Sequence, residues 1–292
     1  MTNALYQFSR SMDTKIHPPL RQINKARKLV QVVPGRGFGE TSIDWVELQK
    51  MSQAMVSYNF STGNIDTVDF ALTNSKIPIV WKDYTIDRRL YEAMRMKGTE
   101  VDASAALDAA YMVNSAEETM ILRGVSRDGT NYEMNGLYEG AGIDYDSSTN
   151  VGAFGGIQDA VVGAYELMDV ADVPTDALKW NLTMAPNIYN KVLQSRNASG
   201  HREIPELLDL LNGGNIFKSG TLASGKALLS PTPDTGSQYV DFYLSQEVFT
   251  EHGIDSKHPD TGPIYGRVYE AGVLRIRKNA VLAKLSNLAT SA

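Results

Sequence analysis

The sequence predicts an α+β fold, and three features of the chain support this assignment. Small apolar residues recur at intervals of three and four between Ala106 and Met120, which is the spacing of one face of an α-helix. Segments 77–86 and 264–284 alternate apolar and polar residues, as strands with one buried face do. Helical and strand patterns alternate over residues 150–244, which indicates a second unit.

The first 44 residues have the composition of an arm. Pro18 and Pro19 interrupt a short helical pattern, and residues 21–28 are polar and basic. Residues 29–33 form a β pattern that stops at the glycine-rich segment 35–39, where glycine permits backbone angles that other residues avoid. We expect this segment to be a flexible corner.

Residues 45–76 mix β-prone and polar residues around Ser61-Thr62-Gly63-Asn64, which predicts two extended strands and a turn. Apolar residues are too sparse here for a separate core, and a two-stranded ribbon is marginally stable alone. We therefore expect this extended loop to project and to bury its surface against another molecule. The candidate assembly residues are Trp45, Met51, Met55, Tyr58, Phe60, Ile65 and Phe70.

A peripheral unit is predicted from residues 77–149 and 245–292. A strand over 77–86 places Ile79 and Trp81 on one face, and Pro78 confines it to an edge or to a first strand position. Asp87 can cap a helix over 88–96, and a long helix follows over 103–123. Because one face of the long helix carries small residues, another element must approach it closely. Strands over 264–270 and 273–284 complete this unit.

The second unit, residues 150–244, is predicted to contain helices and short strands in alternation. The helices are expected over 156–168, 186–195 and 204–211, and the strands over 178–184, 227–229 and 239–244.

Composition narrows the class of protein. The 292 residues are 42% hydrophobic and 21% charged, which is typical of a folded chain. The net charge of −6 excludes a strongly basic coat for nucleic acid, although a local basic patch is compatible with it. The chain has no cysteine and therefore no disulfide, thiolate zinc site or iron–sulfur cluster. We find neither a signal peptide nor a membrane-spanning stretch and expect a location inside a cell.

Each motif that could indicate catalysis lacks neighbouring residues that its chemistry requires. Residues 220–226 match the spacing of a phosphate-binding loop, but Ala227 stands where a magnesium-binding hydroxyl is needed, and Pro231 excludes the helix that must follow. We expect a turn between strands here. The segment 35–39 lacks the third glycine of a dinucleotide fingerprint, the four histidines form no metal-binding pair, and no serine has a nucleophile's flanking glycines. We expect no catalytic residue, cofactor or metal; a nucleotide-using enzyme is the remote alternative.

Glu117 and Glu118 adjoin on the long helix. Neighbours on a helix point about 100° apart, so these two carboxyl groups cannot act as a facing acid and base. We expect one of them to face solvent and the other to meet a basic residue.

Three segments resemble a known group of shell proteins. Residues 77–89, Ile-Pro-Ile-Val-Trp-Lys-Asp-Tyr-Thr-Ile-Asp-Arg-Arg, resemble the segment between extended loop and spine helix in encapsulins and related major capsid proteins of phages and archaeal viruses. Residues 117–124, followed by Gly136-Leu137, are similar to the helix end and glycine–leucine step of that group. Residues 270–282 resemble its closing strand, so that the likeness extends in order over about residues 29–285.

This resemblance implies the Hong Kong 97 type of capsid fold. It has an N-terminal arm (1–44), an extended loop (45–76), a peripheral domain with a spine helix (103–123) and an axial domain (150–244). Copies of such chains form pentamers and hexamers in a closed icosahedral shell. We expect a viral major capsid protein that encloses double-stranded DNA; an encapsulin nanocompartment around a cargo enzyme is the alternative. Pro18-Pro19 departs from the long amphipathic N-terminal helix of encapsulins and favours the virus.

The expected partners follow from the resemblance. The arm residues Arg21, Lys25, Arg27 and Lys28 are candidates to face packaged DNA, and pairing with acidic residues of a neighbouring subunit is an equal alternative. Portal, scaffold and decoration proteins are further candidates, whereas a membrane is not. The expected location is the virion, assembled in the host cytoplasm, or the cytoplasm for a nanocompartment.

Overall fold

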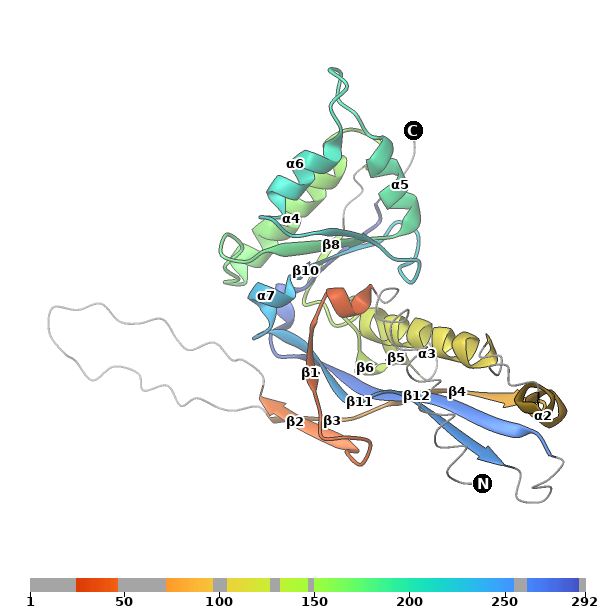
Figure 1. Ribbon diagram of the computed structural model, residues 1–292. Coiled ribbons are helices and arrows are strands. Elements are labelled where there is room, and N and C mark those ends of the chain that lie inside the picture. The colour runs from red at the N-terminus through yellow and green to blue at the C-terminus, as the bar shows by residue number, and fades with distance from the viewer. Residues whose placement is uncertain are drawn as a thin grey trace, which may run out of the picture.

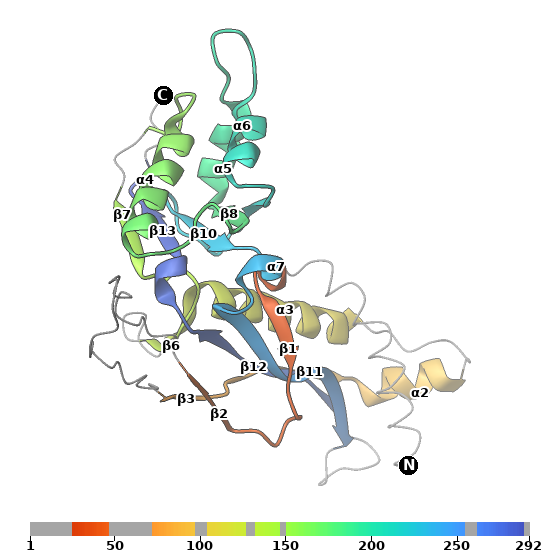
Figure 2. The ribbon, with the colours of Figure 1, turned by 90° about the vertical axis from the view of Figure 1, so that its left-hand side faces the viewer.

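The computed structural model describes residues 25–46, 72–96, 104–126, 132–146, 150–254 and 262–288. These residues form two lobes, each built on one main sheet (Figures 1 and 2). The lower lobe has a four-stranded sheet with the order β1-β11-β12-β4, and the upper lobe has a five-stranded sheet with the order β7-β13-β10-β8-β9. Helices pack on both sheets, so the architecture is α+β, as predicted.

In the lower lobe, the long helix α3 lies along one face of the sheet (Figure 1). Its small residues Ala106, Ala109 and Ala110 are buried against Val268, which explains the close approach predicted from their spacing. Strand β1 runs parallel to β11, and β12 pairs antiparallel with both β11 and β4. The elements of this lobe are η1 (Ala26–Lys28), β1 (Gln31–Pro34), β4 (Ile79–Ile86), α2 (Arg88–Met96), α3 (Ser104–Arg123), β11 (Val240–Ile254) and β12 (Ile264–Ile276).

Helix α2 begins where the sequence predicts. The backbone N–H of Arg89 donates a hydrogen bond of 2.7 Å to Oδ1 of Asp87, which satisfies one of the unpaired donors at the start of the helix.

The upper lobe has a sheet whose central strands are buried along their whole length. Every residue of β8 and β10 is buried, so both faces of these strands are covered. The elements of this lobe are β7 (Ile143–Asp146), α4 (Gly156–Val170), β8 (Trp180–Met184), α5 (Pro186–Gln194), α6 (Glu203–Leu210), β9 (Ile216–Lys218), β10 (Ala227–Pro231), α7 (Pro233–Gly236), η2 (Asn279–Val281) and β13 (Ala283–Ser286).

The sheets do not follow the segment boundaries expected from the sequence. Strands β7 and β13 lie outside residues 150–244, yet both belong to the upper sheet, where β13 pairs with β10 and β7. Strand β11 begins within 150–244, yet it belongs to the lower sheet. The two strands expected over 264–284 are one strand, β12, followed by β13 in the other lobe. Pairing between distant segments decides membership of a sheet, and local patterns cannot show it.

Part of the expected arm belongs to the folded body. Ala26, Leu29 and Val30 are buried in the main core, and β1 is an edge strand of the lower sheet. The glycine-rich corner that follows is fixed, in contrast to the prediction of flexibility. The N–H of Gly35 donates to the carbonyl oxygen of Leu244 at 2.7 Å, and the hydroxyl of Ser245 donates to the carbonyl oxygen of Gly37 at 2.7 Å.

The end of α3 is held by the residues that follow the strand pair β5 (Gly124–Ser126) and β6 (Tyr132–Asn135). The N–H groups of Leu137 and Tyr138 donate to the carbonyl oxygens of Ile121 and Leu122, both at 2.8 Å, and so satisfy acceptors of the last helical turn. A Cβ on Gly136 would lie 2.3 Å from the backbone nitrogen of Gly124. Glycine at position 136 is therefore required for the two backbones to approach.

Candidate functional site

A two-stranded ribbon projects from the lower lobe at the end opposite α2 (Figure 1). Strands β2 (Ser42–Val46) and β3 (Leu72–Lys76) pair antiparallel with each other and with no other described strand. Trp45 is half-buried, whereas the cross-strand neighbours Val46 and Leu72 are exposed, Leu72 by 67%. Of the seven candidate assembly residues, Trp45 alone is described; Met51, Met55, Tyr58, Phe60, Ile65 and Phe70 lie outside the described residues.

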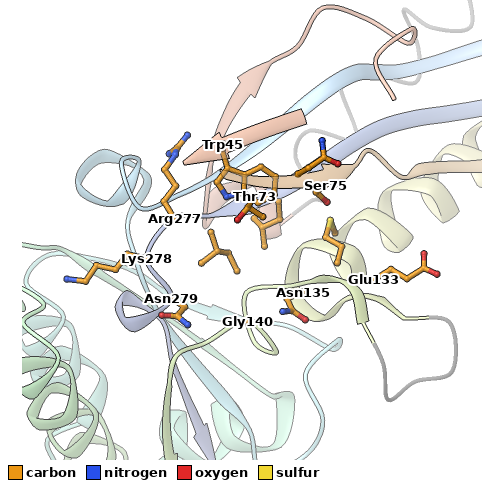
Figure 3. Close-up of a pocket in the computed structure, with 13 residues that line it drawn as sticks. Trp45, Thr73, Ser75, Glu133, Asn135, Gly140, Arg277, Lys278 and Asn279 are labelled. Atoms are coloured by element: carbon orange, nitrogen blue, oxygen red, sulfur yellow. The ribbon is translucent and has the colours of Figure 1, made fainter. Parts of the chain in front are cut away.

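A cavity of about 380 Å³ separates the root of this ribbon from the body. Figure 3 shows the ribbon residues Trp45, Thr73 and Ser75 on one side and Asn135 and Asn279 on the other. The indole N–H of Trp45 is buried and has no hydrogen-bond partner among the described residues. The lining mixes apolar residues with amides, hydroxyls and the charged residues Glu133, Arg277 and Lys278, so the cavity offers hydrogen bonds and mixed charge. It leaves the root of the ribbon loosely supported by its own subunit.

The face of the lower sheet opposite α3 carries an aromatic strip, which we define as Phe38, Trp81, Phe249 and Tyr269. Tyr269 is the direct cross-strand partner of both Phe249 and Trp81, so these side chains point to the same face. The ring centroids of Phe38 and Phe249 lie 5.0 and 5.7 Å from that of Tyr269. Trp81 is 60% exposed, so the strip presents a large apolar surface.

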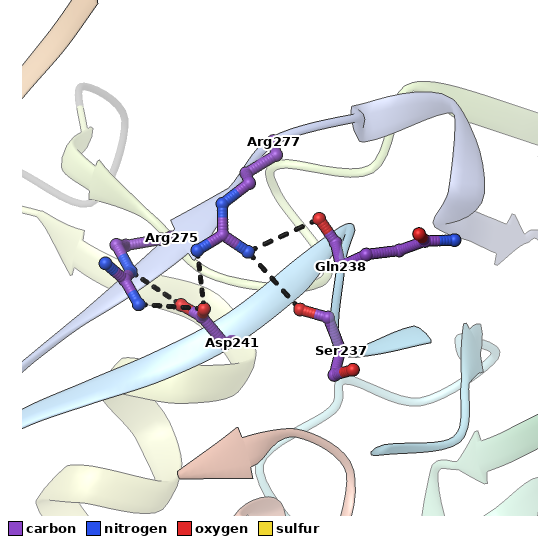
Figure 4. A network of polar contacts seen from close by, with 5 residues as sticks. All are labelled: Ser237, Gln238, Asp241, Arg275 and Arg277. Atoms are coloured by element: carbon purple, nitrogen blue, oxygen red, sulfur yellow. Dashed lines mark hydrogen bonds and ion pairs between the residues drawn. The ribbon is translucent and has the colours of Figure 1, made fainter. Parts of the chain in front are cut away.

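Charged pairs lie towards both ends of β12. Arg267 contacts Asp83 through two hydrogen bonds of 2.6 and 2.9 Å at an exposed position. Nearer the other end, the buried Asp241 accepts hydrogen bonds from Arg275 at 2.6 and 2.8 Å and from Arg277 at 2.7 Å (Figure 4). The second cluster ties β11 to β12 where the two lobes meet.

The basic arm differs from the expectation. Arg27 donates to Oε1 of Glu117 at 2.7 Å and also to Oε1 of Glu270, so these two partners belong to its own chain. Lys25 Nζ donates to the carbonyl oxygen of Lys218 at 3.0 Å, and the side chain of Lys28 is exposed. Arg21 lies outside the described residues. The sequence could not reveal the pairing of Arg27, because Glu270 is 243 positions away.

The two adjacent carboxyl groups of α3 have different surroundings, as expected. Glu117 is buried and meets Arg27, whereas Glu118 is partly exposed and accepts a hydrogen bond of 2.9 Å from the Ser219 hydroxyl. The suspected phosphate loop that follows Ser219 is a turn between β9 and β10, as predicted, and Lys226 lies 4.9 Å above the ring of Tyr138.

In the part of the chain that the structure describes, no group of three His, Asp or Glu side chains lies close enough together to hold a metal ion. No helix among those same residues has the length and apolar character needed to cross a membrane.

Tyr84 and His252 meet across β12. The Tyr84 hydroxyl lies 2.6 Å from Nε2 of His252, and a Cβ on Gly266 would lie 2.2 Å from Cζ of Tyr84, so glycine leaves room for the contact. Burial lowers the pKa of His252 from 6.5 to about 4. The stability that the neutral ring provides is therefore present above pH 6.5 and is lost as the pH falls towards about 4.

Acidification from about pH 7 to about pH 5 is accordingly expected to lower the melting temperature of the protein. The variant His252→Gln, which can still accept the Tyr84 proton, is expected to show a smaller decrease, whereas the control His201→Gln, in an exposed loop, keeps the parental decrease. Melting curves at several pH values measure this. Equal slopes in His252→Gln and the parent would contradict the assignment.

A long helix on a four-stranded sheet, a second lobe and a projecting ribbon make up the Hong Kong 97 capsid fold, which is the fold of shell-forming proteins. The chain belongs to the Linocin_M18 family, described as "encapsulating protein for peroxidase", whose model matches residues 6–256. Proteins of this group build shells and are not enzymes, and the chain is accordingly a structural protein that assembles with copies of itself.

Known proteins agree with this assignment. The type 1 encapsulin shell protein EncA of Myxococcus xanthus (strain DK1622) is 25% identical over 276 residues, which cover 93% of this chain and 89% of that protein. A diheme-cytochrome-encapsulin shell fusion protein of Kuenenia stuttgartiensis is 26% identical over 179 residues; the match covers 61% of this chain and 46% of the fusion, so the chain spans less than half of that longer protein.

Solved structures show the same fold. The virus-like particle from Pyrococcus furiosus is 18% identical, with 96% of this chain and 99% of that chain covered at a TM-score of 0.65. The capsid of Myoviridae phage XM1 is 11% identical, with 91% and 92% covered at a TM-score of 0.67.

Proposed function

We propose that the chain forms the shell of an encapsulin nanocompartment in the cytoplasm and that the shell encloses a cargo enzyme. The observation that carries this proposal is the family match over residues 6–256, since the family is described as encapsulating a peroxidase. Both curated relatives described above are encapsulin shells. The likeness to phage capsids concerns the fold, at 11% identity for phage XM1. The encapsulin shell, which was the alternative in the sequence analysis, is therefore the preferred function, and the viral capsid becomes the alternative.

The charge of the chain supports the same choice. Packaged DNA needs cations to neutralise its phosphates. Arg27, one of the four arm cations proposed for that role, is held by two carboxylates of its own chain, and the net charge is −6. We therefore do not propose DNA, portal or scaffold partners.

The aromatic strip is the surface that we propose for cargo docking. Rigid aromatic side chains lose little conformational entropy on binding and are enriched among the residues that dominate binding energy. The strip lies on the sheet face that α3 leaves uncovered, and Trp81 is mostly exposed. A short apolar segment of a cargo protein would fit such a surface.

Particles purified from the native source test the shell and its contents together. Uniform hollow particles that contain a co-purifying enzyme and no nuclease-protected DNA are expected. Nuclease-protected DNA inside the particles would favour the viral capsid, and a small globular species without particles would contradict both functions.

The variant Trp81→Ala is expected to form normal shells that contain at least about tenfold less cargo, because it removes the most exposed aromatic side chain of the strip. The control Tyr111→Ala changes an aromatic residue of similar exposure, 51%, on α3, the opposite side of the sheet. The ratio of enzyme to shell protein in purified particles is the measurement. Equal cargo loss in both variants, or none in Trp81→Ala, would contradict docking on the strip.

A further inference from the structure

The cavity between the ribbon and the body, which we call the ribbon-root cavity, has the size of a ligand pocket. Its volume is about 380 Å³. Pockets for small molecules have volumes of about 300–1,000 Å³. The ribbon face with Trp45, Thr73 and Ser75 forms one wall, and residues of β6, β12 and η2 form the other (Figure 3). A ligand in this space would therefore contact both the ribbon and the body.

Three polar groups of the lining have no hydrogen-bond partner among the described residues. The indole N–H of Trp45 is buried in the ribbon wall. The side-chain amides of Asn135 and Asn279 belong to the opposite wall, and neither makes a hydrogen bond within the described part of the chain. A buried donor without a partner is unfavourable, and an amide offers donors beside an acceptor. A ligand that satisfies these groups presents an acceptor to the indole and a donor next to an acceptor to each amide.

The wall formed by the body also has an apolar part. Met134 and Leu274 are buried, and the partly buried Ile276 lines the cavity with them. A sugar carries hydroxyl groups around its whole ring, and some of them would face these aliphatic side chains without a partner. A flat heteroaromatic ring has its polar atoms at the edge and apolar faces on both sides. The lining therefore favours an aromatic heterocycle over a sugar.

The charged side chains of the lining favour a neutral ligand. Figure 3 shows Arg277, Lys278 and Glu133 turned away from the centre of the cavity. Arg277 donates to Oδ2 of Asp241 at 2.7 Å, and Nζ of Lys278 donates to the carbonyl oxygen of Asp172 at 3.0 Å. Both cations therefore already have partners outside the cavity, and neither is positioned to bind the phosphate of a nucleotide.

We propose that the ribbon-root cavity binds an uncharged aromatic heterocycle of about the size of a purine base. Trp45 donates to an acceptor of the ring, and Asn135 and Asn279 pair with its polar edge. Asparagine pairs in this way with the donor and acceptor edge of adenine in nucleic acids. The bound ring joins the ribbon to the body and supports a segment to which its own subunit otherwise gives little support. This binding concerns the subunit and does not depend on what the shell encloses.

Isothermal titration calorimetry of the intact chain with adenine as the probe tests the site. Adenine is expected to bind with a Kd below about 1 mM, and glucose, which represents the sugars, at least about tenfold more weakly. Trp45→Phe keeps an aromatic ring without the N–H, and Asn279→Asp replaces amide donors by a carboxylate. Each is expected to weaken adenine binding by about tenfold. The control Asn190→Asp, at an exposed position of α5, keeps the parental affinity.

Hydrogen exchange of the parent chain is a second measurement that requires no variant. Adenine is expected to slow exchange in peptides that contain β2 and β3 by at least about threefold and to leave peptides that contain α5 unchanged. No binding of adenine at about 5 mM would overturn the proposal, as would equal affinity in Asn279→Asp and the parent. Tighter binding of glucose than of adenine, or slower exchange in the upper lobe alone, would also overturn it.

Discussion

Replacement of residues 47–71 by a short turn between Val46 and Leu72 is expected to give a folded subunit that no longer forms shells. The ribbon pairs only with itself among the described strands, and a cavity separates its root from the body, so its own subunit gives it little support. Contacts that cross between subunits bury additional area, and repetition around a shell multiplies their effect. Electron microscopy measures assembly, and thermal unfolding measures the subunit.

Single substitutions in the ribbon provide the matched comparison. Leu72→Ser removes an exposed apolar side chain and is expected to weaken assembly without a change in subunit melting, whereas Lys76→Ser, also exposed and on the same strand, is expected to assemble normally. Intact shells from the shortened chain would show that the loop is dispensable. An unfolded subunit would show instead that the loop belongs to the core of its own chain.

The variant Gly136→Ala is expected to destabilise the subunit by at least about 3 kcal/mol, the upper part of the range for overpacking. The added Cβ would lie 2.3 Å from the nitrogen of Gly124 and 2.5 Å from the carbonyl carbon of Arg123, which are backbone atoms that cannot rotate away. The displaced chain would also lose the hydrogen bonds from Leu137 and Tyr138 to the end of α3. Denaturant unfolding of the parent and the variant measures the difference.

Gly220→Ala is the control, because a Cβ there meets no atom within 4 Å and its backbone angle is not one that glycine alone adopts. It is expected to change the free energy of unfolding by less than about 1 kcal/mol. Similar losses in both variants would indicate a general effect of removing glycine rather than the clash at the end of α3.

Local features of the fold could be predicted from the sequence, and pairings between distant segments could not. The bounds of α2 and the cap from Asp87 follow from neighbouring residues, and the closeness of α3 to the sheet follows from its alanines. The continuity of β12 through Gly272 depends on β11, which adjusts its register between Leu244 and Phe249. No local pattern contains that information.

The candidate sites show the same division. Alternation placed Ile79 and Trp81 on one face of a strand, but the sequence could not tell whether that face was covered. Phe249 joins Trp81 and Tyr269 because β11 pairs with β12, and Phe38 joins them because the corner after β1 lies across β11. The bonds of Arg27 to Glu117 and Glu270 could not be predicted for a related reason, since burial and partners are properties of the folded chain. The role of the extended loop stays a prediction.

The crossing of the chain from β12 to β13 has a mechanical consequence. One of the covalent segments that join the lobes, residues 277–282, runs from the sheet of one lobe into the sheet of the other, where β13 lies between β10 and β7. Tension carried by this segment pulls along the axes of two strands and loads their hydrogen bonds together rather than one after another. Pressure from the contents of a closed particle would be shared by many bonds at once.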